Sequence, residues 1–382
     1  MPSEVVNQNR LVDFFVELAR CNTPPRRERS ASEFTRARLE ALGFECYHDD
    51  AGEKVSGGEI GNLIAFKKGN VTNGTPIFLS AHFDTVEATP GLEPIIDGDV
   101  IRSDRTTILG ADDKCGVAAI VEAMEEIIER DLPHGDIQLL LTICEEIGLL
   151  GAAAMDPSSI KAKYGFVFDT GPPVGGFVYH APTQDTFEVW IHGTAAHAGA
   201  APEQGVSAIR IAATAISRMK LGRVDPDTTA NVGIIQGGTA ANIITPEVYL
   251  KCEARSRVAD KLERQRTHMI DTFNAVAAEM GGSCDFKVVR NYEGYEIPMD
   301  SPLLALAEKA CERIGVDFLL RVTGGGADAN VFNRFGVPTT VVGCGMQNIH
   351  RHDEFVLISD IVKSVELVLA LVATAAEGEA GV

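Results

Sequence analysis

The sequence predicts an α/β protein with a smaller α+β domain inserted into it. Short apolar runs alternate with helical stretches over roughly the first 180 residues, a different order follows to about residue 290, and the first pattern then returns. A chain of 382 residues also suits about two domains. We therefore place the larger domain at residues 1–179 and 292–382, and the inserted domain at residues 180–291.

The larger domain should open with two helices, because residues 8–20 and 30–42 carry apolar residues at helical spacing. Strand-like apolar runs follow, with a helix predicted from Val117 to Arg130 among them. The runs are "NLIAF", "PIFLSA", "IQLLLTIC", "GFVF" and, much later, "TTVVGCG". This alternation describes a sheet covered by helices.

The inserted domain shows a βαββαβ order, the split arrangement of a small α+β domain. Its strands are expected in "TFEVWIHG", "ANVGIIQGG", "EVYLKCEARS" and "CDFKVVR". Its helices are expected over Val206 to Met219 and Lys261 to Met280.

Composition excludes several classes of protein. A formal net charge of −20 argues against binding nucleic acid, which requires clustered Lys and Arg. The N-terminus lacks a signal peptide pattern, and no apolar run is long enough to span a membrane. The eight cysteines form no CxxC pair, which is typical of reduced thiols. We expect a soluble cytoplasmic protein that binds neither nucleic acid nor membranes.

Histidine and acidic residues recur where the larger domain's strands end. Ligands of α/β sheets bind at the carboxyl edge, so these side chains should converge there. They are His82 and Asp84 after "PIFLSA", Asp112 in "LGADDKCG", Glu145 and Glu146 after "LLLTIC", Asp169 after "GFVF", and His350 in "GMQNIHRHDEF". Any one of them alone is more simply explained as a helix cap or a solvated loop residue.

Together, these residues would place at least five carboxylates and two imidazoles in one cleft, where like charges require a compensating cation. We expect two divalent metal ions that share a bridging carboxylate, and the nitrogen and oxygen ligands favour Zn, Mn or Co over Ca. The adjacent Glu145 and Glu146 would then have separate tasks. One would bind a metal ion, and the other would be the general base that deprotonates the bridging water.

The segments "HFDT", "GADDKCG", "CEEIG", "FDTG" and "HRHDEF" occur in this order over nearly the whole chain. Together they resemble the motifs of the M20 family of co-catalytic metallopeptidases, in particular its peptidase T-like branch. The resemblance implies that His82, Asp112 and Asp169 hold one ion, and that Asp112 bridges to a second ion held by Glu146 and His350.

The same resemblance makes Glu145 the general base, which would activate the water and then pass the proton to the leaving amine. Asp84 would orient a metal-bound imidazole. His350 is preferred to His352 as the ligand, because its spacing to Glu354 fits the family motif.

The inserted domain carries further residues with roles implied by the resemblance. His197, in "GTAAHAGAAPEQGVSAI", would reach across a homodimer and stabilise the oxyanion in the partner's site. Asn242 and Arg255 would contact substrate, Arg255 by binding a carboxylate, although a structural ion pair is an equal alternative for Arg255. Gly325, in "TGGGADANVF", would line the substrate pocket.

The implied protein is a two-metal aminopeptidase-type α/β catalytic domain with a ferredoxin-like lid that also dimerises. It would release the N-terminal residue of short peptides, tripeptides in particular, with zinc preferred over manganese or cobalt. Two alternatives stay open. One is carboxypeptidase, dipeptidase or N-acyl amino acid deacylase chemistry at the same centre, and the other is a non-catalytic metal-dependent binding protein.

Overall fold

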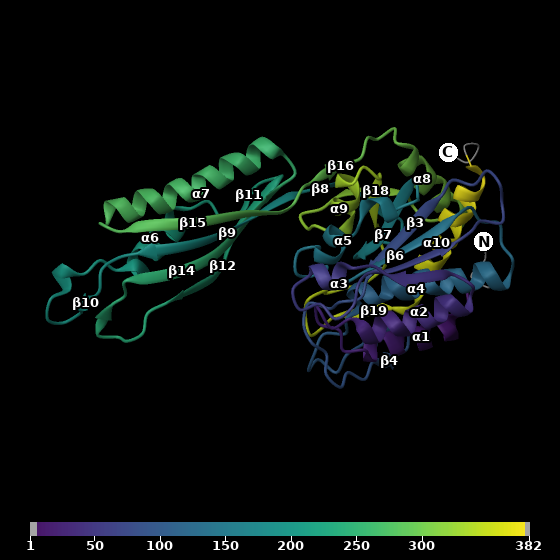
Figure 1. The fold of residues 1–382 in the computed structure, drawn as a ribbon, viewed down its shortest axis with the longest axis horizontal. Coiled ribbons are helices and arrows are strands. Elements are labelled where there is room, and N and C mark those ends of the chain that lie inside the picture. Colours follow the sequence, from purple (N-terminus) through teal and green to yellow (C-terminus); the bar gives the residue numbers. More distant parts are fainter. Residues whose placement is uncertain (1–5, 379–382) are drawn as a thin grey trace. The chain divides into compact units, whose positions relative to one another are not determined.

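The computed structural model describes residues 6–378, which form two compact units (Figure 1). The larger unit extends to Tyr179 and continues over Glu296–Val322 and from Ala327 onward. The smaller unit comprises His180–Tyr295 and the short segment Thr323–Gly326. The insertion expected at residues 180–291 lies within the smaller unit, which runs on to residue 295 and also includes part of the glycine-rich segment.

The larger unit is built on one mixed sheet with a parallel centre. Its strands lie in the order β1 (Glu45–His48), β2 (Leu63–Lys67), β6 (Ile137–Thr142), β3 (Ile77–His82), β7 (Tyr164–Thr170), β18 (Thr339–Gly343), β8 (Gly176–Ala181) and β16 (Tyr295–Glu296), and β17 (Leu319–Val322) pairs with β8. The central strands β6, β3, β7 and β18 are mutually parallel. Their carboxyl ends therefore meet at one edge, as the sequence predicts.

Helices cover this sheet (Figure 1). Helix α4 (Ala111–Glu129) packs on β3 and β7, and it contacts α1 (Gln8–Arg20), α2 (Arg29–Ala41) and α10 (Ile358–Ala376), while α8 (Pro302–Ile314) packs on α10. The short helix α9 (Asp328–Arg334) contacts β7 and β18, and it packs on α5 (Leu150–Ala154), which contacts α3 (Ala51–Lys54). The remaining elements are η2 (Pro157–Ser159) and a small sheet ordered β19 (Phe355–Leu357), β5 (Val100–Arg102), β4 (Ile95–Asp97).

Most helix predictions are confirmed to within two residues, but the start predicted for α4 at Val117 is wrong. The helix begins at Ala111, and its first turn is interrupted because Asp112 and Asp113 have non-helical dihedral angles. The helix also approaches the sheet closely. A Cβ atom on Gly116 would lie only 2.3 Å from the carbonyl oxygen of Phe168 in β7, so only glycine fits there.

The smaller unit has a five-stranded antiparallel sheet in the order β11 (Gly222–Asp225), β12 (Thr228–Gly237), β14 (Glu247–Ser256), β9 (Thr183–His192), β15 (Ser283–Tyr292). Helices α6 (Ala208–Arg218) and α7 (Ala259–Glu279) pack on it (Figure 1). Alternate residues of β9, namely Phe187, Val189 and Ile191, are buried in its core. The ferredoxin-like order is confirmed, with β11 added at one edge.

Two short strands complete the smaller unit, β10 (Ala196–His197) and β13 (Ile243–Ile244), which pair with each other, together with η3 (Pro202–Gln204). Across residues 6–378, no helix combines the length and the apolar character that crossing a membrane requires.

Candidate metal centre

The strand ends of the larger unit bring the predicted histidine and acidic residues together. His82 is the last residue of β3, and Asp169 lies near the end of β7. Glu145 and Glu146 follow β6, and Asp112 lies in the irregular first turn of α4. The ring of His350, from the segment after β18, lies against the Asp112 carboxylate and so joins the same group. Apart from His350, these side chains are at most about one-tenth exposed.

Asp112 lies between the two imidazoles. Its Oδ1 is 3.1 Å from Nε2 of His82, and its Oδ2 is 3.3 Å from Nε2 of His350. The same His350 nitrogen is 3.0 Å from Oε1 of Glu146. One carboxylate thus presents a different oxygen to each imidazole, which is the arrangement that a bridging ligand requires.

Two further carboxylates face His82. Its Nε2 atom is 3.8 Å from Oδ1 of Asp169 and 3.9 Å from Oε2 of Glu145. Among the described residues, His82, Asp112 and Glu146 form one group whose donor atoms all lie within 4.8 Å of one another. His82, Asp113 and Asp169 form another, so Asp113 joins the cluster although the sequence analysis assigned it no role.

Asp84 contacts the site in two ways. The carboxylate accepts the backbone N–H groups of Glu145, at 2.9 Å, and Glu146, at 3.1 Å. Nδ1 of His82 lies 2.9 Å from the Asp84 backbone oxygen but 3.5 Å from its carboxylate. Asp84 therefore holds the glutamate pair with its side chain and faces His82 mainly with its backbone.

Burial and crowding determine the electrostatics of the cluster. Burial raises the pKa of Glu145 and of Asp169 well above their ordinary values, and neighbouring carboxylates raise both further. Burial opposes protonation of His82, but hydrogen bonding to Asp112 helps to raise its pKa well above 6.5. Hydrogen bonds from His350 to the carboxylates of Asp112 and Glu146 raise the pKa of His350 to about 10, and the bond to Asp112 has the larger effect. The crowding that shifts these pKa values makes the cluster favourable for positive charge.

Glu354 is a buried site residue that the sequence analysis used only for its spacing. Its carboxylate accepts the backbone N–H groups of Leu109 at 2.8 Å, Gly110 at 2.7 Å and Asp112 at 3.0 Å. Glu354 thus fixes the loop that carries the bridging carboxylate. The sequence shows an acid four residues after His350, but it does not show that this acid binds the backbone of the distant Asp112 loop.

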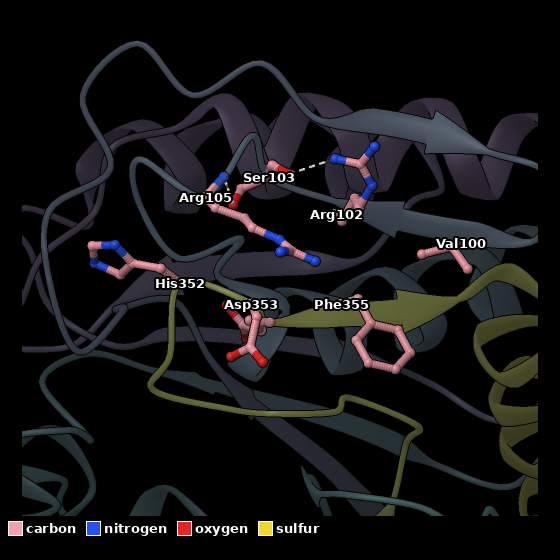
Figure 2. A pocket seen from close by; sticks show the side chains of 8 residues that line it. Val100, Arg102, Ser103, Arg105, His352, Asp353 and Phe355 are labelled. Atoms are coloured by element: carbon pink, nitrogen blue, oxygen red, sulfur yellow. Dashed lines mark hydrogen bonds between the residues drawn. The ribbon is translucent and has the colours of Figure 1, made fainter.

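A pocket of about 210 Å³ lies beside Glu354. Figure 2 shows the Arg105 side chain extending across it, above Asp353 and Phe355. Its lining residues are Val100, Arg102, Ser103, Arg105, His352, Asp353, Glu354 and Phe355. The pocket is therefore lined in part by Glu354, the residue that holds the Asp112 loop.

Asp328 and Glu28 are two further buried acids that the sequence analysis missed. Thr142, the last residue of β6, donates its hydroxyl to Oδ2 of Asp328 at 2.5 Å. Glu28 accepts the backbone N–H of Cys144 at 3.1 Å. Both contacts hold the chain just before the glutamate pair, and neither acid lies in an apolar pattern that would have predicted its burial.

His197 and Asn242 lie together in the smaller unit and are exposed. His197 pairs with Ile243 across β10 and β13, and the next residue donates its N–H to the Asn242 carbonyl at 2.9 Å. Nδ1 of His197 accepts the N–H groups of Gly199 and Ala200, at 3.2 and 3.1 Å. In the neutral ring, the proton is therefore on Nε2, which can donate outward.

Arg255, on β14, forms the ion pair that the sequence analysis considered as an alternative. Its Nε and Nη2 atoms donate to the two carboxylate oxygens of Glu253, at 3.1 and 3.0 Å. Its Nη1 atom reaches the Tyr292 hydroxyl at 3.3 Å and the Gly324 carbonyl at 3.5 Å. Arg255 is thus close to the glycine segment that contains Gly325.

Comparisons with known proteins agree with this geometry. Residues 78–374 match the model of peptidase family M20/M25/M40. The chain is 40% identical to aminopeptidase PepT from Bacillus cereus ATCC 10987, with a TM-score of 0.88 over 97% of this chain and 100% of that one. It is 36% identical to a tripeptidase from Staphylococcus aureus, with a TM-score of 0.93 over 98% and 100%.

Protein YqjE from Bacillus subtilis (strain 168) is 39% identical over 373 residues, which are 98% of this chain and all of that protein. These similarities extend over the whole chain, and the family match spans every residue of the predicted metal centre. The chain belongs to peptidase family M20/M25/M40, and it is a peptidase.

Proposed function

We propose that this peptidase is a two-metal aminopeptidase that removes the N-terminal residue of short peptides, tripeptides in particular. The observation that carries the proposal is the buried Asp112 carboxylate, which presents one oxygen to each of two imidazoles in a cluster of further acids. The substrate class is supported by similarity to an aminopeptidase PepT and to a tripeptidase at 36 to 40% identity.

His82, Asp112 and Asp169 would hold one ion, and Asp112, Glu146 and His350 would hold the second. The donors are nitrogen and oxygen atoms only, a set that accepts Zn, Mn and Co, and we infer zinc. The set fits divalent cations because it gathers buried acids around two imidazoles, and positive charge would offset the repulsion between those acids.

When bound, the ions would polarise the scissile carbonyl and lower the pKa of water at the site. Glu145 would take a proton from that water and deliver it to the leaving amine. Burial raises its pKa, which suits a group that must bind and release a proton. Asp84 holds the Glu145 amide, so the base has a fixed starting position.

We assign substrate contacts in the smaller unit to Asn242, Arg255 and Gly325, with Arg255 binding the substrate carboxylate. The Nε2–H donor of His197 would stabilise the oxyanion in the site of a homodimer partner. We infer a cytoplasmic location and dimerisation through this unit.

The test is to incubate the metal-loaded protein with an unblocked tripeptide of three different residues and to identify the products by mass spectrometry. We expect the first residue and an intact dipeptide. Release of the last residue instead would identify a carboxypeptidase. Cleavage of only an N-acetylated substrate would identify a deacylase, and either result would overturn the proposal.

Glu145→Gln tests the assignment of the base in the same assay. The amide cannot take a proton from water, so we expect kcat to fall by at least about a hundredfold. The metal content should stay at the wild-type value, measured by inductively coupled plasma mass spectrometry. A fully active Glu145→Gln variant would refute the role of this residue.

A further inference from the structure

The connection between α1 and α2 lies against the loops that carry the metal centre. The backbone oxygen of Thr23 accepts the N–H of Thr85 at 2.9 Å, and its hydroxyl donates to the Phe83 carbonyl at 2.8 Å. These contacts fall on either side of Asp84. Lys114, just beyond the irregular turn of α4, donates to another backbone carbonyl of the connection at 2.7 Å. The connection therefore touches two of the site's loops.

Glu28 ends this connection and is fully buried. Its Oε1 atom accepts the backbone N–H groups of Arg26 at 2.7 Å and Cys144 at 3.1 Å, and it lies 3.2 Å from the Cys144 thiol. Its Oε2 atom is buried without a hydrogen-bond partner among the described residues. Burying an unsatisfied polar atom costs stability, so the Glu28 carboxyl group is destabilising on its own account. Its contacts through Oε1 must therefore serve another purpose.

Cys144 is the residue at which the chain turns from β6 into the glutamate pair, with a φ of 54° in the left-handed region. A residue other than glycine is strained in this region and needs support from its surroundings. Glu28 holds the Cys144 amide, and Asp84 holds the next two, those of Glu145 and Glu146. Two carboxyl groups from distant segments thus fix three successive amides.

We propose that Glu28 is a positioning residue for the general base: through the Cys144 amide, it holds the turn that aims Glu145. The proposal rests on the proposed role of Glu145. It requires a hydrogen-bond acceptor at Oε1 rather than a charge. Burial and the nearby Asp84 carboxylate raise the pKa of Glu28, so glutamine, which presents the same oxygen without a charge, is a close replacement.

The test compares Glu28→Ala with Glu28→Gln in the zinc-loaded full-length protein, using kcat and KM for an unblocked tripeptide. Removing the acceptor should misplace the base, so Glu28→Ala should lower kcat at least about tenfold. KM should change less than twofold and bound metal should be unchanged. Glu28→Gln should keep kcat within about threefold of wild type. Ser32→Ala, a buried change in α2 next to His48, is the matched control and should leave kcat unchanged.

Three results would overturn the proposal. One is a folded Glu28→Ala variant with wild-type kcat, and another is a Glu28→Gln variant with a tenfold loss. The second result decides the question even if the alanine variant does not fold. The third is a wild-type protein that cleaves no peptide, which overturns the proposed function as well. Wild-type turnover separates that case from a failure of the Glu28 proposal alone.

Discussion

The two units present their candidate functional residues in opposite ways. In the larger unit, the acids around His82 are at most about one-tenth exposed and lie 3.1 to 3.9 Å from its Nε2 atom. In the smaller unit, His197 and Asn242 are exposed on a short two-stranded sheet. A cluster of buried charges must be neutralised, so its residue types alone indicate a cation site. Exposed residues carry no such requirement, and only family resemblance assigned these two a role.

The largest difference between the buried and the exposed residues should appear in the metal content and kcat of Asp112 and His197 variants. Asp112→Ala removes the oxygen donor shared by both imidazoles, so we expect loss of bound metal and a fall in kcat of more than about a thousandfold. His197→Ala should leave the metal content unchanged and lower kcat by about a hundredfold. Metal analysis and steady-state kinetics on the tripeptide give both values. Full metal content in Asp112→Ala would contradict the bridging assignment.

A smaller effect is expected from Glu354, which supports the metal centre without belonging to it. In Glu354→Ala, the amides of Leu109, Gly110 and Asp112 lose their acceptor, and the Asp112 loop should loosen. We expect metal affinity to fall by about 10- to 100-fold, measured by competition with a chelator. Asp104→Ala is the control, because this acid is exposed and accepts its hydrogen bonds from the neighbouring Thr106. Equal affinities in the two variants would show that the loop needs no support from Glu354.

The sequence predicted those features that follow from local patterns. Apolar periodicity placed α1 at its observed bounds, and strand ends identified the residues that gather around Asp112. The missed features depend on tertiary contacts. Glu28 lies in the charged segment "PPRRERS", and its burial follows only from the contact between the α1–α2 connection and the loop at Cys144. Asp112 and Asp113 read as a loop before the helix, so the start of α4 was placed too late.

Cys144 shows a case in which a local pattern and the fold act in the same direction. The sequence argues against a nucleophilic role for this thiol, because neighbouring carboxylates disfavour a thiolate. In the structure, burial raises the pKa of Cys144, and Glu28 raises it further. The causes in the structure are therefore tertiary, and the neighbouring Glu145 indicates the same direction only because it has the same charge as Glu28.

The smallest effects should appear in stability, and they again separate buried from exposed charges. Arg10 joins α1 to α4, with Glu122 at 2.8 Å and Glu126 at 3.0 Å, and both glutamates are almost fully buried. Arg218 and Glu279, in the smaller unit, pair at 2.6 Å with both side chains about half exposed. Arg10→Met would remove the cation that pairs with the buried Glu122, while Glu126 keeps its ion pair with Arg130, so we expect a loss of about 3 kcal/mol in the free energy of unfolding.

Arg218→Met should cause no measurable change, because solvent screens an exposed pair. Urea denaturation followed by circular dichroism measures the Arg10 variant. Fluorescence of Trp190, the single tryptophan, measures the Arg218 variant, since this residue lies on β9 of the same unit. Equal shifts in the two variants would mean that burial does not determine the strength of these pairs. The inference of a metal centre from buried acids would then be unsupported, because it assumes that burying a charge without a partner is costly.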